Sequence, residues 1–303
     1  MMFDVSWKYD TLREASAQAR ILVSKESIEA IKTGKVPKGD VLSVARTAGI
    51  MAAKRTGEII PLCHNIPVDY VSVDYELEEN EIILKSIVKS VWKTGVEMEA
   101  LTAVAIASLT VYDMLKPIDE NIVIREIKLI YKKGGKSDFK IELDRPIKAG
   151  IVVISDSVSA GTREDKSGRT IESELKKWNV EIVSYKILPD EREKIEKELI
   201  RLSDELKVDL VLTTGGTGLG PRDVTPEATK NVIEREVEGI IDAARNYGQR
   251  RIPLAMLSRA VAGVRGSTLI INIPGSPRAA KEYMDSLFPA IFHAFKMIEG
   301  GGH

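Results

Sequence analysis

The sequence feature that most constrains this chain is the stretch TTGGTGLGPRDVTPEAT, residues 213–229. A short apolar run, residues 209–212, precedes it and predicts a strand, and a helix start follows. Thr225 is expected to cap that helix, Pro226 suits its first position, and Glu227 favours its positive end. A strand, a glycine loop and a helix N-terminus in this order commonly hold an anion through backbone N–H groups. The stretch has neither the GK[ST] of a P-loop nor the G-x-G-x-x-G spacing, so alone it does not name a chemistry.

Strands and helices alternate through the rest of the second half. Strands are expected at 151–155, 180–188 and 268–273, and helices near 170–177, at 191–206 with Asp190 as cap, onward to 247, and to about 298. This alternation predicts an α/β fold with a doubly wound, mostly parallel sheet, in which ligands bind at the carboxyl ends of strands. We therefore expect Asp156, Asp190 and the loops 215–223 and 274–278 to share one rim. Alone, Asp190 is equally well explained as a helix cap, and Pro274-Gly-Ser-Pro as a turn.

The first half has a different pattern, which predicts an α+β domain. Helices are expected at 24–33, 41–56 and 97–115, and strands at 68–77, 82–91 and 122–131. From residue 68 apolar side chains alternate with polar ones, which indicates an antiparallel hairpin with one solvated face. Helices that pack on one face of such a sheet complete the α+β arrangement.

Several polar residues in the first half have both a structural and a chemical explanation. Asp113 and Lys116 are three residues apart on one helix face, so they are either a proton-transfer pair or a local salt bridge. His64 is as consistent with a structural hydrogen bond as with catalysis. Glu97 and Glu99 begin a helix, where a carboxylate can simply favour the dipole.

Composition narrows the class of protein. A chain of 303 residues is long enough for two domains, and we place their boundary so that they span 1–147 and 148–303. The net charge of −1 argues against a nucleic-acid partner, and the single cysteine, Cys63, indicates a reducing compartment. No run is expected to be apolar for long enough to cross a membrane, so the expected location is cytoplasmic and the expected partners are small molecules.

The first half resembles the cyclic pyranopterin monophosphate synthase family of molybdenum cofactor biosynthesis over residues 4–139. The matching segments are Lys38-Gly-Asp-Val, Ala45-Arg-Thr-Ala-Gly-Ile, Ala53-Lys-Arg-Thr, Ile60-Pro-Leu-Cys-His, Thr94-Gly-Val-Glu-Met-Glu-Ala-Leu-Thr-Ala, Val111-Tyr-Asp-Met-Leu-Lys and Gly134-Gly-Lys-Ser. The resemblance implies a ferredoxin-like fold that assembles into dimers and hexamers. It also implies conversion of 3′,8-cyclo-7,8-dihydro-GTP into cyclic pyranopterin monophosphate with release of pyrophosphate.

The same resemblance assigns roles to residues of this chain. Asp113, Lys116 and Lys38 would be catalytic, and a lysine buried among other cations would have a lowered pKa. The substrate-binding set would comprise Lys38, Lys54, Arg55 and Lys136 for the triphosphate, and His64, Glu97, Met98 and Glu99 for the pterin. The chain departs from the family pattern at Asn65, Trp92 and Asp138, none of which is a residue with an implied chemical role.

Residues 148–298 resemble the molybdopterin adenylyltransferase family, whose fold also occurs in gephyrin-type proteins. The match rests on Ile154-Ser-Asp, Leu188-Pro-Asp, Thr213-Thr-Gly-Gly-Thr-Gly, Arg222-Asp-Val-Thr-Pro-Glu-Ala, Leu257-Ser-Arg and Pro274-Gly-Ser-Pro. The resemblance implies adenylylation of molybdopterin by Mg-ATP and assembly into trimers.

In this implied site Asp190 and Asp223 would hold Mg²⁺, and Asp156 would place the substrate. The glycine loop Gly215, Gly216, Thr217 and Gly218 would bind phosphate, and Pro274, Gly275, Ser276 and Pro277 would help to hold the pterin. The whole chain is thus expected to be a bifunctional molybdenum or tungsten cofactor enzyme and a homo-oligomer. The alternative is that its second domain binds pterin, or acts as a scaffold, without catalysis.

Overall fold

The computed structural model of this chain describes all residues except 136–137, 139–144, 179 and 302–303. The chain divides into two compact units, Met1–Asp138 and Phe139–His303. The boundary that the sequence places after residue 147 falls further along the chain, at the first residue of strand β5 (Ile147–Ile154).

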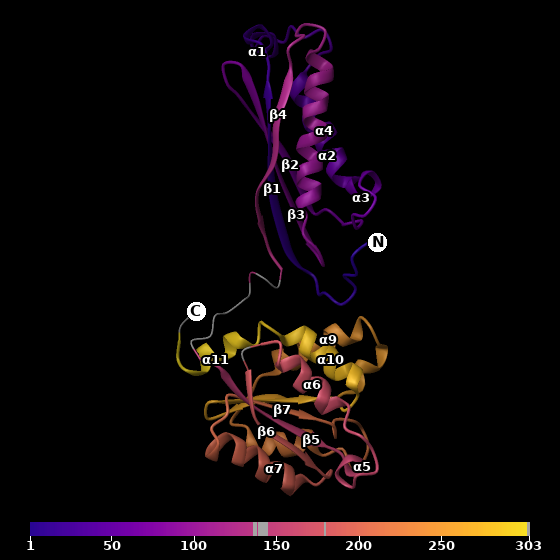
Figure 1. Ribbon diagram of the computed structural model, residues 1–303, viewed down its shortest axis with the longest axis vertical. Helices are drawn as coiled ribbons and strands as arrows, with labels where there is room; N and C mark the ends of the chain where they lie inside the picture. Colours follow the sequence, from indigo (N-terminus) through magenta and orange to yellow (C-terminus); the bar gives the residue numbers. More distant parts are fainter. Residues whose placement is uncertain (136–137, 139–144, 179, 302–303) are drawn as a thin grey trace. The chain divides into compact units, whose positions relative to one another are not determined.

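The first unit contains a four-stranded antiparallel sheet in the order β2-β3-β1-β4. In chain order its elements are β1 (Thr11–Leu22), α1 (Lys25–Lys32), α2 (Val41–Lys54), α3 (Thr56–Ile59), β2 (Tyr70–Leu77), β3 (Glu81–Trp92), α4 (Glu97–Leu115) and β4 (Val123–Lys133). Figure 1 shows α2 and α4 on the same face of this sheet. The predicted α+β arrangement and the β2-β3 hairpin are confirmed, and α1 begins as expected with the Ser24 side chain accepting from Ser27 N–H.

Small residues let the helices approach this sheet closely. Ala15, Ala17 and Ala19 of β1 are fully buried in the core, so little side-chain volume separates strand from helix. Gly49 of α2 lies directly against Ala103 of α4. Close packing of this kind fixes the positions of the helix ends, where the predicted site residues lie.

By length and composition, α4 is apolar enough to cross a membrane, so the expectation that no run of the chain reaches this length is wrong. Most of the apolar stretch is nevertheless inside the fold, since 56% of its residues are buried. The helix packs on the sheet and on α2, which accounts for its apolar composition by core burial.

The second unit contains a six-stranded sheet in the order β6-β5-β7-β10-β9-β8. Its elements are β5, α5 (Asp156–Ser159), α6 (Ser167–Leu175), β6 (Val180–Leu188), α7 (Arg192–Ile200), the π-helix η2 (Arg201–Glu205), β7 (Leu210–Thr214), α8 (Thr225–Val232), β8 (Arg235–Glu236), α9 (Glu238–Gln249), the 3-10 helix η3 (Pro253–Leu257), β9 (Ala262–Arg265), β10 (Thr268–Ile273), α10 (Pro277–Leu287) and α11 (Phe292–Ile298). Strands β6, β5, β7 and β10 are parallel, and β9 and β8 are antiparallel, which confirms the predicted mostly parallel sheet.

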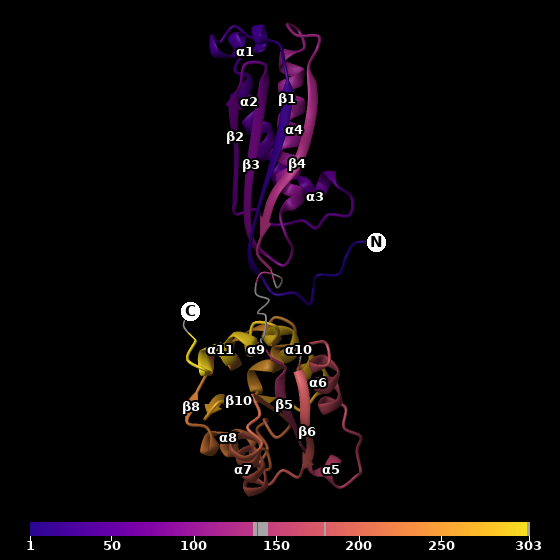
Figure 2. The same ribbon diagram turned by 60° about the vertical axis from the view of Figure 1, so that its left-hand side comes forward.

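Both faces of this sheet are covered, because successive residues of β5 enter different cores. Ile151 and Val153 pack with α6, α9, α10 and α11, whereas Val152 and Ile154 pack with α7 and α8. Figure 2 shows these two helical layers on either side of the strands. The chain passes from β5 to β6 on one side and then to β7 on the other, so a topological switch point lies between β5 and β7.

Three local predictions in this unit are wrong. Asp190 does not cap α7: the N-cap is Glu191, and no side chain completes it. Thr225 is inside α8 rather than at its cap, and its hydroxyl donates to the Gly215 carbonyl oxygen at 2.9 Å. The last predicted helix is interrupted at the Phe288-Pro289 bond, between α10 and α11.

Candidate functional sites

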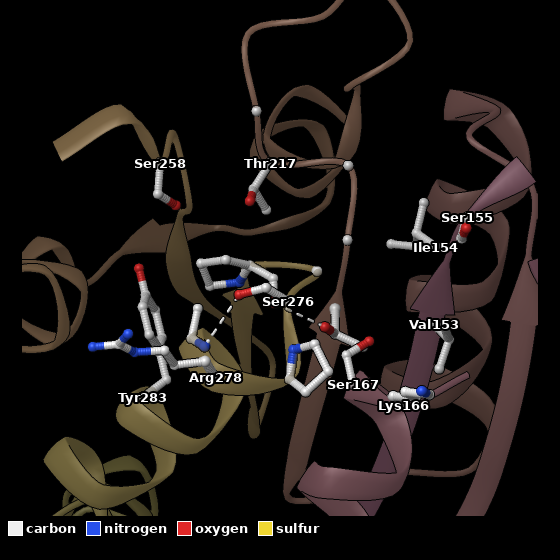
Figure 3. A pocket seen from close by; sticks show the side chains of 18 of the residues that line it. Val153, Ile154, Ser155, Lys166, Ser167, Thr217, Ser258, Ser276, Arg278 and Tyr283 are labelled. Atoms are coloured by element: carbon white, nitrogen blue, oxygen red, sulfur yellow. Dashed lines mark hydrogen bonds between the residues drawn. The ribbon is translucent and has the colours of Figure 1, made fainter. Parts of the chain in front are cut away.

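A cavity of about 700 Å³ opens at the carboxyl ends of the parallel strands in the second unit. Segments that follow β5, β6, β7 and β10 line it, together with residues of α9 and α10. Those segments include Asp190, Gly215, Gly216, Thr217, Gly218, Asp223, Pro274, Gly275, Ser276 and Pro277. Asp190 and the two predicted loops therefore share one rim, whereas Asp156 is not among the residues that line the cavity. Figure 3 shows Thr217 and Ser276 facing each other across it. A cavity of this size matches those that bind drug-sized molecules.

The glycine loop is held in a backbone conformation that side chains disfavour. Gly215 and Gly216 have φ of +104° and +60°. A Cβ on Gly215 would lie 2.0 Å from the Ile154 carbonyl oxygen, so the loop packs directly on the end of β5. Gly275 lies against Gly215 from the other side. The loop is thus fixed between two strand ends, with its backbone at the cavity surface.

Asp156 and Asp190 bind each other's backbone across the switch point. Asp156 N–H donates to Asp190 Oδ2 at 2.8 Å, and Asp190 N–H donates to Asp156 Oδ1 at 3.0 Å. Arg222 neutralises Asp156 through an ion pair of 2.9 Å and lowers the pKa of that carboxyl. The pKa of Asp190, in contrast, is raised by burial and by the carboxylates of Asp156 and Asp223.

This charge distribution fits a divalent cation at Asp190 and Asp223. Within the described part of the chain, no group of three or more His, Cys, Asp or Glu side chains is arranged to hold a metal. Two carboxylates are nevertheless what Mg²⁺ commonly takes from a protein when substrate phosphates and water supply its other ligands. A cation there would also relieve the repulsion among the carboxylates around Asp190.

Arg259 holds the glycine loop and the segment after it through hydrogen bonds, and the sequence did not predict this role. Its guanidinium donates to the carbonyl oxygens of Gly218 at 2.7 Å and Asp223 at 2.5 Å, and it forms an ion pair with Glu227. Its own N–H donates to the Thr217 carbonyl oxygen at 3.0 Å. The Leu257-Ser-Arg motif marked this arginine, but nothing in its spacing indicated a contact with residues 217–227.

In the first unit, three predicted catalytic residues meet at the C-terminal end of α4. Asp113 Oδ1 is 2.8 Å from Lys116 Nζ, and its Oδ2 is 2.7 Å from Lys38 Nζ. Lys38 also donates to the Asp113 backbone carbonyl at 2.8 Å. Asp113 therefore bridges two lysines from different elements, which is more than a local salt bridge within one helix.

The protonation of this cluster differs from one expectation. Hydrogen bonds from Lys116 and Lys38 lower the pKa of Asp113 to about 2, so the carboxylate is ionised at neutral pH. The same bond to Asp113 raises the pKa of Lys116. The lowered pKa expected for a lysine buried among other cations does not apply to Lys116, because its neighbour is an anion and its side chain is exposed.

The other predicted residues of this unit lie toward the opposite end of α4. Glu97 forms an ion pair of 3.1 Å with Lys132, and Met98 is exposed. Glu99 is 2% exposed, its Oε2 has no hydrogen-bond partner, and burial raises its pKa to about 7. Burial and the nearby Glu99 carboxylate raise the pKa of the Cys63 thiol. The next residue, His64, donates from Nε2 to the Phe3 carbonyl oxygen at 2.8 Å.

Lys54 and Arg55 lie toward the same end of α4 as Glu97, away from Asp113. Helix α2 runs antiparallel to α4, because Lys38 before α2 meets Asp113 while Gly49 meets Ala103. The exposed Lys54 and Arg55 at the far end of α2 are therefore near the start of α4. Lys136 is outside the described residues. At about 1.5 Å per residue, Glu97 and Asp113 are separated by roughly 24 Å along the helix.

Comparison with known proteins covers both units. Residues 2–135 match the model of the "MoaC family", and residues 150–293 match that of a "Probable molybdopterin binding domain". A "Molybdenum cofactor biosynthesis bifunctional protein" of Chlorobaculum tepidum is 40% identical over 302 residues, covering 100% of this chain and 96% of the relative. The chain belongs to the family of bifunctional molybdenum cofactor biosynthesis proteins.

Each half of this bifunctional protein also has separate relatives. A "Cyclic pyranopterin monophosphate synthase" of Peptoclostridium acidaminophilum is 54% identical over 136 residues, covering 45% of this chain and 87% of the relative. The crystal structure of a molybdopterin biosynthesis enzyme, MoaB, from Thermus thermophilus is 44% identical and covers 51% of this chain and 97% of that one, with a TM-score of 0.49. The N-terminal unit thus matches the MoaC family, and the C-terminal unit matches the molybdopterin binding domain family.

Two positions at which this bifunctional protein departs from the MoaC pattern lie in hydrogen-bonded loops, Trp92 through its backbone and Asp138 through its side chain. The Trp92 carbonyl oxygen accepts from Arg13 Nε at 3.2 Å, and Asp138 accepts from Gly134 N–H at 2.5 Å. Arg13 also donates to the carbonyl oxygens of Lys93 and Gly134. The loops before α4 and after β4 are therefore tied together by one arginine, which sequence reasoning also missed.

Proposed function

We propose that the N-terminal unit converts 3′,8-cyclo-7,8-dihydro-GTP into cyclic pyranopterin monophosphate and pyrophosphate. The observation that carries this proposal is the Lys38–Asp113–Lys116 cluster, which sets an ionised carboxylate between two cations. The order of elements, β-α-β-β-α-β with strands β2-β3-β1-β4, supports a ferredoxin-like fold for this unit.

The cluster suits the chemistry of this conversion. A hydroxyl oxygen of the substrate attacks the α-phosphorus, loses its proton, and displaces pyrophosphate. The two ammonium groups neutralise negative charge on the phosphates, and Asp113 holds them in place and is an acceptor for a proton. In the free protein the hydrogen bond to Asp113 raises the pKa of Lys116. A bound triphosphate would compete with Asp113 for Lys116 and weaken that hydrogen bond.

The separation of the predicted residues along α4 supports a site built from two copies of the chain. One copy would supply Lys38, Asp113 and Lys116, and the other would supply His64, Glu97 and Glu99. An isologous dimer contributes each end of α4 twice and so forms two equivalent sites. This arrangement agrees with the dimers and hexamers that the family resemblance implies.

The reaction assignment is tested by Asp113→Ala and Lys116→Ala, assayed with the cyclic GTP-derived substrate. We expect a loss of product formation of about 10²–10⁴-fold, the usual effect of removing a proton-transfer group. Lys128→Ala is the matched control, because Lys128 forms an exposed ion pair with Glu126 on β4. Turnover at the wild-type rate in both cluster variants would exclude this assignment.

We propose that the C-terminal unit adenylylates molybdopterin with Mg-ATP. The terminal phosphate oxygen of molybdopterin attacks the α-phosphorus of ATP, and the bond to the departing pyrophosphate breaks. The observation that carries the proposal is the cavity in which the glycine loop lies beside Asp190 and Asp223. Phosphoryl transfer of this kind depends mainly on positioning and charge neutralisation, which such a loop and a metal supply.

The residues divide these tasks. Asp190 and Asp223 would hold Mg²⁺, which neutralises charge on the phosphates when bound. The backbone of Gly215–Gly218 would bind phosphate, and Asp156, held by Arg222, keeps Asp190 in place through the reciprocal backbone bonds. The segment Pro274–Pro277 would contact the pterin.

A pterin-binding role without catalysis is the second candidate, and the "Probable molybdopterin binding domain" description favours it. Molybdopterin, Mg²⁺ and ATP incubated with the protein distinguish the two: adenylylated product supports catalysis, and tight pterin binding without product supports the scaffold. We expect Asp223→Ala and Asp190→Asn to lower transfer by about 10²–10³-fold, as for other lost charge-stabilising groups. Asp204→Asn is the control, because Asp204 pairs with Arg265 outside the cavity.

A further inference from the structure

The cavity of the C-terminal unit has two chemically different ends. One end is polar, with Arg163, Asp165 and Lys166 among its lining residues. The other is lined by the apolar side chains Ile252, Leu254, Ala255 and Leu257, by the hydroxyl-bearing residues Ser258 and Tyr283, and by Arg278 and Glu282 of the same helix as Tyr283. In Figure 3 Ser258 and Tyr283 lie together on one side of the cavity, across from Ile154 and Lys166. The family motifs at the glycine loop and at residues 274–277 do not include Tyr283.

One polar group at the second end lacks a well-formed hydrogen bond. Tyr283 is 5% exposed, and its hydroxyl has no partner in hydrogen-bonding geometry, although Ser258 is near enough to lower its pKa. Arg245, on the neighbouring helix α9, lies behind the residues that line the cavity: its Nη1 pairs with Asp242 at 3.2 Å, and its Nη2 donates weakly to the Ser258 carbonyl oxygen at 3.4 Å. Buried polar groups are nearly always paired, so the unpaired Tyr283 hydroxyl at the cavity wall indicates that a partner is missing.

The remaining surroundings define what the partner would be. The side chains of residues 252–257 offer an apolar wall, which a flat ring can cover. A tyrosine hydroxyl is a hydrogen-bond donor as well as an acceptor, and burial raises the pKa of Tyr283, so the phenol keeps its proton at neutral pH. An apolar wall beside an unpaired donor matches a fused nitrogen heterocycle, whose faces are apolar and whose edge carries acceptors.

We propose that Tyr283, supported by Arg245 and Ser258, recognises the polar edge of the fused nitrogen heterocycle of a substrate at this end of the cavity. The ring lies against residues 252–257, and the Tyr283 hydroxyl donates to an acceptor on its edge. Tyr283 is then a specificity-determining residue for the ligand bound there. This inference rests on the proposed function, in which the two substrates, ATP and molybdopterin, both carry such a ring.

Tyr283→Phe tests this proposal because it removes only the hydroxyl. Equilibrium binding of the full-length protein is measured separately with Mg-ATP and, without oxygen, with molybdopterin. We expect Kd to rise about tenfold for the ligand whose ring occupies this end, and to stay within about twofold for the other, because an unpaired edge acceptor loses one hydrogen bond. Which ligand responds identifies whether purine or pterin lies there.

Tyr247→Phe is the matched control, since Tyr247 is also buried, on α9, but does not line the cavity. Unchanged affinity for both ligands in Tyr283→Phe overturns the proposal, as does an equal loss for both with a lowered melting temperature, which means a collapsed wall. Failure of the proposed function is seen separately, because the wild-type protein then forms no adenylylated product from Mg-ATP and molybdopterin, whatever it binds.

Discussion

The two units of this chain assemble their predicted sites in opposite ways. In the C-terminal unit, residues that follow four strands and residues of the surrounding helices line one cavity. In the N-terminal unit, the residues with implied roles fall into two groups, at the two ends of α4. The difference follows from the sheets. Parallel strands direct all their carboxyl ends to one edge, where loops converge, whereas antiparallel strands alternate direction and gather nothing at one edge. A parallel sheet can complete a site within one chain, and the antiparallel unit is proposed to need a second copy.

Mixing two inactive variants is the strongest test of this contrast. We expect Asp113→Ala and Glu99→Ala each to lose cyclic pyranopterin formation by about 10²–10⁴-fold. When the two are unfolded together and refolded, about a quarter of wild-type activity should return, because half of the chains form mixed dimers with one intact site each. Product formation is measured as a function of the mixing ratio.

The matched control uses Asp113→Ala with Lys116→Ala, which lie at the same end of α4. That mixture cannot restore an intact end and should stay inactive. Activity that fails to return in the first mixture, with oligomers present, contradicts the two-copy site and removes the contrast between the units.

The single-chain cavity predicts the second-largest effect, from Gly215→Ala. A Cβ at this position meets the Ile154 carbonyl oxygen at 2.0 Å, so the loop must leave the end of β5. We expect adenylyl transfer to fall by about 10²-fold, the scale of a 1 Å misplacement, while cyclic pyranopterin formation stays unchanged. Both activities are measured on the same preparation.

Gly161→Ala separates the clash from backbone strain alone. Gly161 also has a positive φ, +72°, but a Cβ there meets nothing within 4 Å. It should cost about 1 kcal/mol of stability and leave adenylyl transfer intact. Equal loss of transfer in both variants would show that the conformation, and not the contact with β5, is what the loop requires.

Arg259→Lys is expected to have a smaller effect on the same loop. Lysine keeps the charge beside Glu227 but lacks the planar guanidinium that donates to the carbonyl oxygens of Gly218 and Asp223 at the same time. We expect transfer to fall by roughly tenfold, the worth of about one lost hydrogen bond, in steady-state assays. Arg265→Lys, which alters the Asp204 pair outside the cavity, is the control. A loss as large as that of Gly215→Ala would mean that Arg259 contacts substrate.

Sequence alone predicted the parts of these sites that depend on chain direction. Asp190 and the loops after β7 and β10 could be placed on one rim because each follows a parallel strand. Asp113 and Lys116 could be paired because three residues separate them on a helix. Most strands and helices were predicted for the same reason, since periodicity is a local property, but strands β1, β8 and β9 were missed.

Long-range contacts were beyond such reasoning. Arg259 reaches back 41 residues to Gly218, and no local pattern encodes that distance. The helix caps predicted at Asp190 and Thr225 were wrong because both side chains make tertiary hydrogen bonds instead. Asp190 accepts from Asp156 N–H, and Thr225 donates to the Gly215 carbonyl oxygen. The two ends of α4 were treated as one site because the sequence shows residues but not their separation in space.

A change in stability rather than in activity is predicted from the protonation of those two ends, which differ within one helix. Asp113 has a pKa of about 2, whereas burial raises the pKa of Glu99 from 4.5 to about 7. A raised folded-state pKa contributes stability below the unfolded value of 4.5, and this contribution is lost as pH rises toward 7. At about 1.4 kcal/mol per pH unit, the loss approaches roughly 3 kcal/mol. Glu99→Gln, which cannot ionise, should become more stable than wild type above pH 7 relative to pH 4.5, as measured by chemical denaturation. Parallel stability curves for the two proteins would show that Glu99 is solvated, and that both ends of α4 are charged in the free protein.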